Sequence, residues 1–395
     1  MHDGRFHRFG KNHFDIDHLG STSIIWSTPS PDAVSTGNSQ TIFSREKTGG
    51  ISRYFICLMM ELIKNGIDIK IISSLHKNKF LNLLPKTYTS GLYFPNYPIL
   101  KFIEILNNNK FNNYINDESI NLIHDTYYTP GIIKPKKIKK IITVHDLIHE
   151  KFKDYYRNYE DEINKKKKAL IDCDHFICVS NNTKNDLIEF YDIEPSKISV
   201  IYHGANHLIN NQDNYDLKIS DPYLLYVGKR DKYKNFIFLL KAYAKCKKVN
   251  QKFKLVCFGG NKFNKIEKKI INELNIQQNI KYVKGDDKIL SAYYSSATSL
   301  ISPSLYEGFG LNIIEAMSFK CPVICSDIDV FKEICGNDAT YFDPKDENNL
   351  IYVMEEYLFK DKYIKNLAFN SYNNSKKFTW EKNCNETINV YKKLA

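Results

Sequence analysis

The stretch SPSLYEGFGLNIIEAMSFKCPVICSD, residues 302–327, predicts a glycine-containing loop, a helix and a strand in direct succession. The apolar run at 298–304 predicts a strand that leads into the loop, and the apolar spacing from Leu311 onward predicts the helix. The Pro-Val-Ile run after the helix predicts the next strand. Strand, helix and strand in this order are typical of a parallel sheet covered by helices.

The same alternation continues on both sides of this stretch. We expect a helix from Ile51 that Gly66 stops, and another helix that opens at Ser180. The expected strands lie at 67–73, 121–125, 139–146, 175–180, 197–203, 223–228, 254–260, 280–285, 298–304, 322–327 and 339–344. This order predicts an α/β fold with two Rossmann-like, doubly wound domains that face a central cleft. Ligands of such sheets bind at the carboxyl ends of the strands, so the site is expected there.

The domain boundaries follow from where this alternation begins and stops. The expected units are a poorly ordered N-terminal extension at 1–38, a first domain at 39–206, a linker at 207–220, a second domain at 221–377 and a last helix at 378–395. The linker is polar and lacks apolar periodicity. The last helix is amphipathic and could return to pack on the first domain or stay with the second.

Composition and charge narrow the class of protein. The 395 residues include 43% hydrophobic residues, which excludes a disordered chain. The net charge of +11 suits phosphorylated ligands or anionic lipid, whereas no recognised nucleic-acid motif supports nucleic-acid binding. The basic stretches 134–140 and 165–168 could rest on anionic headgroups or form a solvated surface.

Cysteine usage and hydropathy predict the compartment. The nine cysteines are scattered without CxxC pairs, which favours a reducing environment. The sequence contains no run of ~18 apolar residues. We therefore expect a cytoplasmic protein that touches the inner face of a membrane at most peripherally.

Two glutamates and two glycines mark the loop and helix of 302–327. Gly308 and Gly310 let the backbone approach a ligand closely, and the amides that open the helix at Leu311 would attract an anion such as a diphosphate. Glu307 and Glu315 could accept hydrogen bonds from hydroxyl groups on either side of that anion. The alternative is a surface glutamate and an ordinary helical glutamate.

Other strand ends carry residues suited to the same ligand. The basic loop 229–235 contains Arg230 and Lys234, which would neutralise a leaving diphosphate unless the loop is merely solvated. Gly49-Gly50 precedes a helix whose first amides could meet a phosphate. His145-Asp146 ends a strand and places an imidazole at the edge of the cleft.

At residues 302–327, with its Glu-x7-Glu pair and the following Pro-Val strand, the chain resembles the retaining glycosyltransferases of family 4 in the GT-B superfamily. Further segments that resemble the family in the same order are TGGISRY (48–54), ITVHDL (142–147), CVSNNTKNDLIEFY (178–191), ISVIYHGAN (198–206) and LLYVGKRDKYKN (224–235). The resemblance covers about residues 41–395. It is strongest with mannosyltransferase-like members that build bacterial polysaccharides.

The resemblance implies transfer of a sugar from a nucleoside-diphosphate sugar to a glycan or a lipid-linked glycan, with retention of configuration. In the family's scheme the acceptor hydroxyl attacks from the face that the leaving group occupied, and the departing phosphate takes the proton. The first domain would bind the acceptor and the second the donor. No cofactor and no metal are implied, since the donor is a co-substrate, and the subgroup favours GDP-mannose.

The resemblance also assigns roles to residues. Arg230 and Lys234 would stabilise the diphosphate, Glu307 would hold sugar hydroxyls and Glu315 would hold the ribose. His145 would lie against the donor sugar near the reacting carbon, so the catalytic set is His145, Arg230, Lys234 and Glu307. The donor-binding set is Gly49, Gly50, Asp146, Gly259, Gly260, Gly308, Phe309, Gly310, Leu311 and Glu315. In this assignment Asp146 could orient His145 or bind a sugar hydroxyl, and Arg53 could organise the glycine loop or the acceptor.

The chain departs from the family pattern at two places. Arg230 lies one residue further from Gly228 than the commonest pattern places its arginine. Polar residues at 34–40 stand where family members have a first strand, so either Ile24-Ile25-Trp26 supplies that strand or the sheet edge is irregular. Asp286-Asp287 is expected to cap a helix rather than to bind a metal. The alternatives to a transferase are a non-catalytic nucleotide-sugar-binding protein of this fold and another enzyme such as a nucleotide-sugar epimerase.

Overall fold

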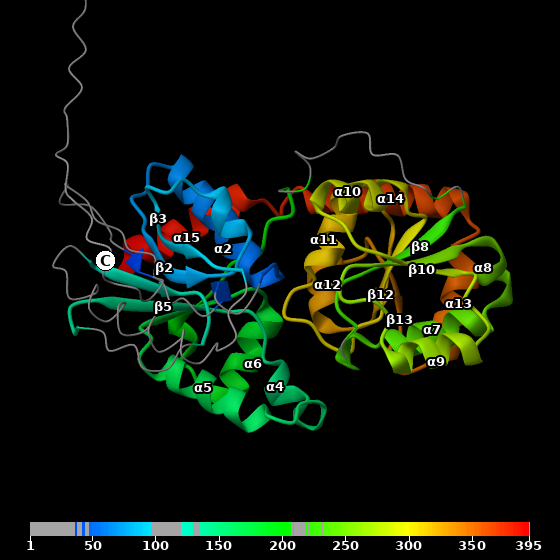
Figure 1. Cartoon of the computed structure of the whole chain (residues 1–395), viewed down its shortest axis with the longest axis horizontal. Helices are drawn as coiled ribbons and strands as arrows, with labels where there is room; N and C mark the ends of the chain where they lie inside the picture. Colours follow the sequence, from blue (N-terminus) through cyan, green and yellow to red (C-terminus); the bar gives the residue numbers. More distant parts are fainter. Residues whose placement is uncertain are drawn as a thin grey trace, which may run out of the picture.

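The computed structural model describes residues 36–37, 42–43, 47–95, 120–128, 135–206, 208, 219, 221–230 and 232–394. It confirms the predicted α/β class, with parallel strands in two domains (Figure 1). We call the part up to residue 206 the first domain and the part from 221 to 377 the second domain. The expected linker at 207–220 lies outside the described residues, apart from positions 208 and 219.

The first domain is built on a parallel sheet whose described strands have the order β1-β4-β5-β6-β7. Their bounds are Thr36–Gly37, Leu122–Asp125, Lys139–Val144, His175–Cys178 and Ile198–Val200. β4 and β6 are buried along their whole length, as is typical of parallel strands that are covered on both faces. The expected strand at 67–73 is β2 (Ile71–His76), but it pairs with β3 (Thr89–Tyr93) in a separate two-stranded parallel sheet.

The structure shows which residues pair with β4 at the start of this sheet. Thr36–Gly37 form β1 and pair in parallel with Leu122 and Ile123 of β4, although the expected boundary at 38 assigned them to the extension. A strand therefore exists within the polar segment, as a two-residue edge. Ile24-Ile25-Trp26 and the rest of 1–35 lie outside the described residues.

Among the described residues, four α-helices with full bounds accompany the first sheet. They are α2 (Gly50–Lys64), α4 (Ile148–Lys151), α5 (Tyr159–Ile171) and α6 (Asn181–Tyr191). α2 ends at Lys64, two residues before Gly66 adopts a φ of 71°, which confirms the predicted stop. α6 begins as predicted, because the Ser180 side chain accepts a hydrogen bond from the backbone N–H of Thr183.

The second domain holds a parallel sheet with the described order β10-β9-β8-β11-β12-β13. The strands β8 to β13 are Tyr223–Val227, Lys254–Phe258, Ile280–Val283, Ser299–Ser302, Val323–Ser326 and Thr340–Phe342. The helices α7 to α14 are Phe236–Lys245, Lys247–Lys252, Lys265–Glu273, Asp287–Ser296, Leu311–Ser318, Asp329–Cys335, Glu347–Tyr357 and Asp361–Ser375. The strand order reverses between β8 and β11, and ligands of such sheets bind at this switch point.

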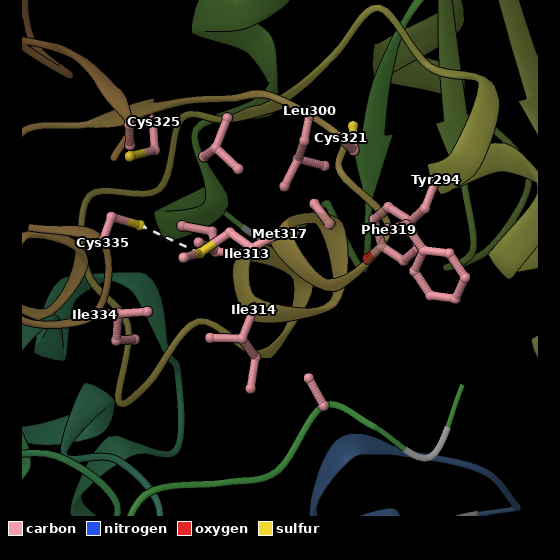
Figure 2. Close-up of a cluster of buried hydrophobic side chains, with 14 of the residues drawn as sticks. Tyr294, Leu300, Ile313, Ile314, Met317, Phe319, Cys321, Cys325, Ile334 and Cys335 are labelled. Atoms are coloured by element: carbon pink, nitrogen blue, oxygen red, sulfur yellow. Dashed lines mark hydrogen bonds between the residues drawn. The ribbon is translucent and has the colours of Figure 1, made fainter. Parts of the chain in front are cut away.

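The helix that follows the switch point is fixed by a buried core. Figure 2 shows α11 contributing Ile313, Ile314 and Met317 to a cluster with side chains from neighbouring elements, among them Leu300 of β11 and Ile334 of α12. All five of these side chains are fully buried. The start of α11 is therefore held rigidly beside the loop that precedes it.

The last helix, α15 (Trp380–Leu394), returns to the first domain. Trp380 and Tyr391 are buried in one cluster with Tyr54 and Phe55 of α2. Figure 1 shows α15, in red, beside α2, in blue. The chain thus crosses between the domains a second time just before α15.

Candidate active site

The loops that follow β8 and β11 meet at the switch point through an ion pair. Lys234 Nζ lies 2.5 Å from Glu307 Oε1, and the two side chains are 23% and 12% exposed. Ser304 Oγ donates to the same carboxylate oxygen at 2.7 Å, and the Leu305 amide donates to Tyr233 O at 2.8 Å. Two predicted residues that are 73 positions apart are therefore brought together. The pair offers an ammonium for phosphate oxygens and a carboxylate for hydroxyl groups.

The predicted helix start follows this pair directly. Gly310 adopts a φ of 106° as the N-cap of α11, a conformation that favours glycine, and the amides of Leu311 and Asn312 open the helix. Glu315 lies one turn further and is buried, and Tyr294 donates to Glu315 Oε2 at 2.9 Å. Burial, together with Glu315, raises the pKa of Tyr294 well above its usual value, so this phenol donates its proton to the hydrogen bond.

The first domain brings His145 to the other side of this loop. His145 follows β5, and its ring packs edge-on against Tyr54, with ring centroids 5.2 Å apart. Its Nε2 has no hydrogen-bond partner among the described residues. Burial, together with His203 and His124, lowers the pKa of His145 well below its usual value, so the imidazole is neutral. A neutral, unpartnered imidazole nitrogen can accept or donate one hydrogen bond to a ligand.

Gly308 marks the contact between the two domains. A Cβ atom added at Gly308 would lie 1.7 Å from the backbone oxygen of His145. Only glycine allows this approach, so the Glu307 loop and the His145 strand end touch through their backbones. Phe309, the next residue, stacks on His203 with ring centroids 4.8 Å apart. The Asp146 carboxylate faces its own chain, where it accepts from the Ile148 amide at the start of α4.

Arg230 does not join the Lys234–Glu307 pair. Its Nε donates to Glu267 Oε1 at 2.8 Å, and its Nη1 donates to the backbone oxygen of Gly259 at 3.3 Å. Its Nη2 contacts Asn261 O, and the side chain is only 4% exposed. The structure therefore uses Arg230 to hold the loop after β9, where Gly259 and Gly260 lie. Its role toward a diphosphate stays a prediction.

Gly49 and Gly50 begin α2 at the edge of the first domain. Gly49 is the N-cap, and a Cβ at Gly50 would meet no atom within 4 Å. One turn later, Arg53 pairs with both carboxylate oxygens of Asp287 at the start of α10, Nη2 lying 2.6 Å from Oδ1. Asp286 caps α10 through the Ile289 amide, as predicted. No group of three His, Cys, Asp or Glu residues that could hold a metal occurs within the described ranges.

Two lysines of the basic stretches are buried, so these two side chains neither reach anionic headgroups nor form part of a solvated surface. Lys140 Nζ lies 3.1 Å from Asp125 Oδ2, and Lys166 Nζ lies 2.9 Å from Glu150 Oε2, with each side chain at most 3% exposed. Contact with an anionic membrane stays a prediction that rests on the remaining lysines. In the part of the chain that the structure describes, helices are too short or too polar to cross a bilayer.

Two hollows of the first domain lie apart from the Lys234–Glu307 pair. A groove of about 750 Å³ lies on the first domain between α5 and α6 and is lined by none of the candidate residues. A cavity of about 60 Å³ borders Ile51, His145 and Asp146. Ligand pockets usually measure about 300–1,000 Å³, so this small cavity by itself does not hold a nucleotide sugar.

Sequence reasoning missed the residues that hold the Glu307 loop. They are Ser180, Thr183, Asp186, Ser304 and Tyr306. Tyr306 stands directly before Glu307, which is a signal that could have been followed. The residues of α6 carry no such signal, because Asp186 lies 120 positions from the tyrosine that it contacts.

Comparison with known families covers most of the chain. Residues 48–207 match the family described as Glycosyltransferase Family 4, and residues 210–378 match the family described as Glycosyl transferases group 1. The boundary between the two matches falls at the segment that separates the two sheets.

Curated relatives include enzymes of O-antigen assembly. The chain is 30% identical over 239 residues to the O-antigen chain mannosyltransferase RfbU of Salmonella typhimurium, a match that spans 58% of this chain and 62% of the relative. It is 25% identical over 285 residues to the O-antigen chain mannosyltransferase B of Escherichia coli, spanning 68% and 74% of the two chains. The chain thus spans about three fifths of the length of RfbU.

Solved structures share the fold. A sucrose-phosphate synthase from Thermosynechococcus elongatus superposes with a TM-score of 0.73 at 21% identity and covers 90% of this chain and 98% of its own. Anabaena Alr3699/HepE, solved in complex with UDP and glucose, superposes with a TM-score of 0.66 at 15% identity and covers 89% and 97%. These similarities confirm the predicted GT-B architecture of two Rossmann-like domains.

Proposed function

Because this chain belongs to the glycosyltransferases, with a family 4 domain followed by a group 1 domain, we propose that it transfers a sugar from a nucleoside-diphosphate sugar to a glycan or lipid-linked glycan. We propose further that the transfer retains configuration and needs no metal ion. The observation that carries the proposal is the Lys234–Glu307 pair, which lies at the switch point of the second sheet, before α11 and beside the His145 strand end.

The proposed donor site extends along one edge of the second sheet. Lys234 can bridge Glu307 and a phosphate oxygen, because an ammonium group carries three donors. The first amides of α11 would face the same diphosphate, and their partial positive charge would stabilise its departure. Glu315, one turn along α11, would accept from the ribose hydroxyls. These groups supply the positive charge that a metal supplies in other transferases.

The proposed reaction is a single front-face displacement. The oxygen of the acceptor hydroxyl forms a bond to the anomeric carbon while the bond from that carbon to the diphosphate breaks. The departing phosphate oxygen takes the hydroxyl proton, so charge and atoms balance without a protein base. His145 and Glu307 would hold the sugar through hydrogen bonds during this exchange.

For the donor we propose GDP-mannose. Its support is the similarity to relatives that are named as O-antigen mannosyltransferases. For the location we propose the cytoplasm, with peripheral membrane contact where the acceptor is lipid-linked.

A donor panel tests the proposal. The purified protein is incubated with GDP-mannose, UDP-glucose, UDP-N-acetylglucosamine or ADP-glucose, first alone for slow hydrolysis and then with mannose-containing oligosaccharides. Nuclear magnetic resonance of the product gives the anomeric configuration, and a parallel reaction in EDTA tests the metal. We expect turnover of GDP-mannose, an α-linked product and an unchanged rate in EDTA. Turnover of a UDP-sugar alone would overturn the donor, and a β-linked product would overturn retention.

A non-catalytic binding protein would give a different pattern. It would show a thermal shift with a nucleotide sugar but neither hydrolysis nor transfer with any donor. A ligand at 100 times its dissociation constant stabilises a protein by about 2.7 kcal/mol, so binding without turnover would be detected.

A further inference from the structure

We propose that Asp186 and Tyr306 are positioning residues through which the first domain sets the place of Glu307. The closing of the two domains, and not donor binding alone, would then complete the site. This inference rests on the proposed transferase function for its kinetic readout, and on the contacts of the loop 303–310 for its structural one.

The first contact is a buried hydrogen bond between the domains. Tyr306 of the second domain donates its hydroxyl proton to Asp186 Oδ2 of α6 at 2.7 Å. The same hydroxyl oxygen accepts from the backbone N–H of Leu147 at 3.2 Å. Tyr306 is 7% exposed and Asp186 3% exposed, so water does not compete for these bonds.

The partner carboxylate is itself anchored in the first domain. Lys151 Nζ of α4 lies 2.6 Å from Asp186 Oδ1, and Asn182 Nδ2 lies 3.3 Å from Oδ2. Burial, followed by the charge of Asp186, raises the pKa of Tyr306, so the phenol keeps its proton and remains a donor. A charged acceptor makes this bond stronger than a neutral one.

The second contact holds the residue on the other side of Glu307. Ser180 Oγ and Thr183 Oγ1 both donate to the backbone oxygen of Gly308, at 2.7 and 3.0 Å. Ser180 is the N-cap of α6 and Thr183 lies in its first turn, and both residues are fully buried. Tyr306 and Gly308 flank Glu307 in sequence, so the first domain holds the tyrosine side chain on one side of the glutamate and the backbone on the other.

The contacts of the residues proposed to bind the nucleotide lie within the second domain. Glu315 accepts from Tyr294, and both residues belong to the second domain. Lys234 and Ser304, which contact the Glu307 carboxylate, also belong to the second domain. Loss of the Tyr306–Asp186 bond should therefore leave nucleotide binding in place and reduce the rate of transfer.

The kinetic test compares Tyr306→Phe, Asp186→Ala, Asp186→Asn and the double variant Tyr306→Phe/Asp186→Ala. A hydrogen bond to a charged group contributes about 1.5–3 kcal/mol, so we expect kcat to fall roughly 10- to 150-fold in Tyr306→Phe. The donor KM and the dissociation constant of the free nucleoside diphosphate should stay within about twofold. Asp186→Asn keeps an acceptor oxygen and should lose less than Asp186→Ala. The double variant should lose no more than Asp186→Ala alone.

The matched control is Tyr223→Phe. Tyr223 is also buried, but its hydroxyl donates to Tyr293 O within the second domain. This variant should keep its kcat. A wild-type kcat in Tyr306→Phe, a parallel loss of nucleotide binding, or additive losses in the double variant would each overturn the inference.

Hydrogen–deuterium exchange supplies a readout that does not need turnover. In Tyr306→Phe we expect faster exchange in peptides that cover 303–310 and 180–187, and unchanged exchange over 254–260. Unchanged exchange at 303–310 would overturn the inference even in an active enzyme. Faster exchange in a protein that never transfers sugar would support the positioning role while the proposed function fails, so the two failures are distinguishable.

Discussion

Arg53 in α2 and Asp287 in α10 join the two domains through a bidentate ion pair. The guanidinium lies over the Phe80 ring, 4.5 Å from its centroid, and its exposed fraction is 19%. Because Arg53 follows Gly49-Gly50 by one turn, the pair ties the glycine loop of the first domain to the second domain. Contacts between the domains thus hold the sheet-end site here as well as at Tyr306 and Gly308.

Removal of this pair should uncouple the domains. A bidentate, half-buried pair exceeds an exposed one in strength, so we expect a coupling free energy of about 1–3 kcal/mol between Arg53→Ala and Asp287→Ala. Denaturant unfolding of the two single variants and the double variant measures this coupling. Lys64 and Glu61 form a more exposed pair within α2 and serve as the control, with a coupling below about 0.5 kcal/mol. If the losses of unfolding free energy in Arg53→Ala and Asp287→Ala simply add up in the double variant, this ion pair does not couple the domains.

Loss of the Lys234–Glu307 ion pair should lower the rate of transfer strongly while the fold remains. Removal of one electrostatic donor from an active site typically costs about 10²- to 10³-fold in kcat, and we expect this range for Lys234→Ala and for Glu307→Gln. Steady-state transfer from the donor measures the rate, and thermal melting measures the fold. Lys241→Ala removes an exposed lysine of α7 and should transfer sugar at the wild-type rate. Wild-type turnover in Lys234→Ala would remove this pair from the mechanism.

Substitution of Gly308 tests the backbone contact between the domains. In Gly308→Ala the new Cβ would lie 1.7 Å from the His145 oxygen, so the loop has to move away. We expect a loss of transfer of at least about tenfold, since a misplacement near 1 Å can cost about 100-fold, together with a lower melting temperature. An alanine variant with unchanged activity would show that the Glu307 loop does not need this contact during turnover.

Buried histidines should make stability depend on pH. Burial lowers the pKa of His124 to about 3, and His124 contacts Tyr391 OH at 2.6 Å and Thr143 Oγ1 at 2.7 Å. The unfolded chain takes up this proton below about pH 6.5, while the folded chain does not. The stabilising contribution is therefore complete above pH 6.5 and is lost as the pH falls toward 3.

The expected size of this effect is about 2 kcal/mol for His124 between pH 7 and pH 5. Urea unfolding at both pH values, in the wild type and in His124→Gln, measures it. The variant should show a smaller difference between the two pH values, whatever its absolute stability. An equal difference in both proteins would mean that His124 has the same pKa in the folded and the unfolded chain.

Much of the fold could be predicted because parallel strands that are buried on both faces leave continuous apolar runs. The runs at 223–228 and 322–327 became β8 and β12, and the start of α11 at Leu311 followed from its glycine and apolar spacing. The separate pairing of β2 with β3 could not be predicted, since strand order depends on contacts that leave no local pattern.

In the candidate site, too, some contacts could be predicted from the sequence and others could not. Lys234 and Glu307 lie at the ends of neighbouring strands, so the sheet topology alone brings them together. Arg230 lies in a loop, and the direction of its side chain depends on Glu267, which is 37 residues away in α9. The bond from Tyr306 to Asp186 joins different domains. Local sequence carries no information on such contacts.

Arg230 itself allows a decisive comparison between a structural and a catalytic role. Its pair with Glu267 is buried, with side chains 4% and 5% exposed, and loss of one partner from a buried pair costs about 3–5 kcal/mol. If Arg230 holds the loop after β9, Arg230→Met and Glu267→Gln should both lower the melting temperature and should reduce transfer to a similar extent. If Arg230 instead turns toward the diphosphate during turnover, Arg230→Met should lose far more kcat than Glu267→Gln. The Nε of Arg230 already donates to Glu267 of α9, and its Nη1 and Nη2 donate to the loop after β9, so we expect the first pattern. Melting curves and transfer rates of the two variants, measured side by side, decide between them.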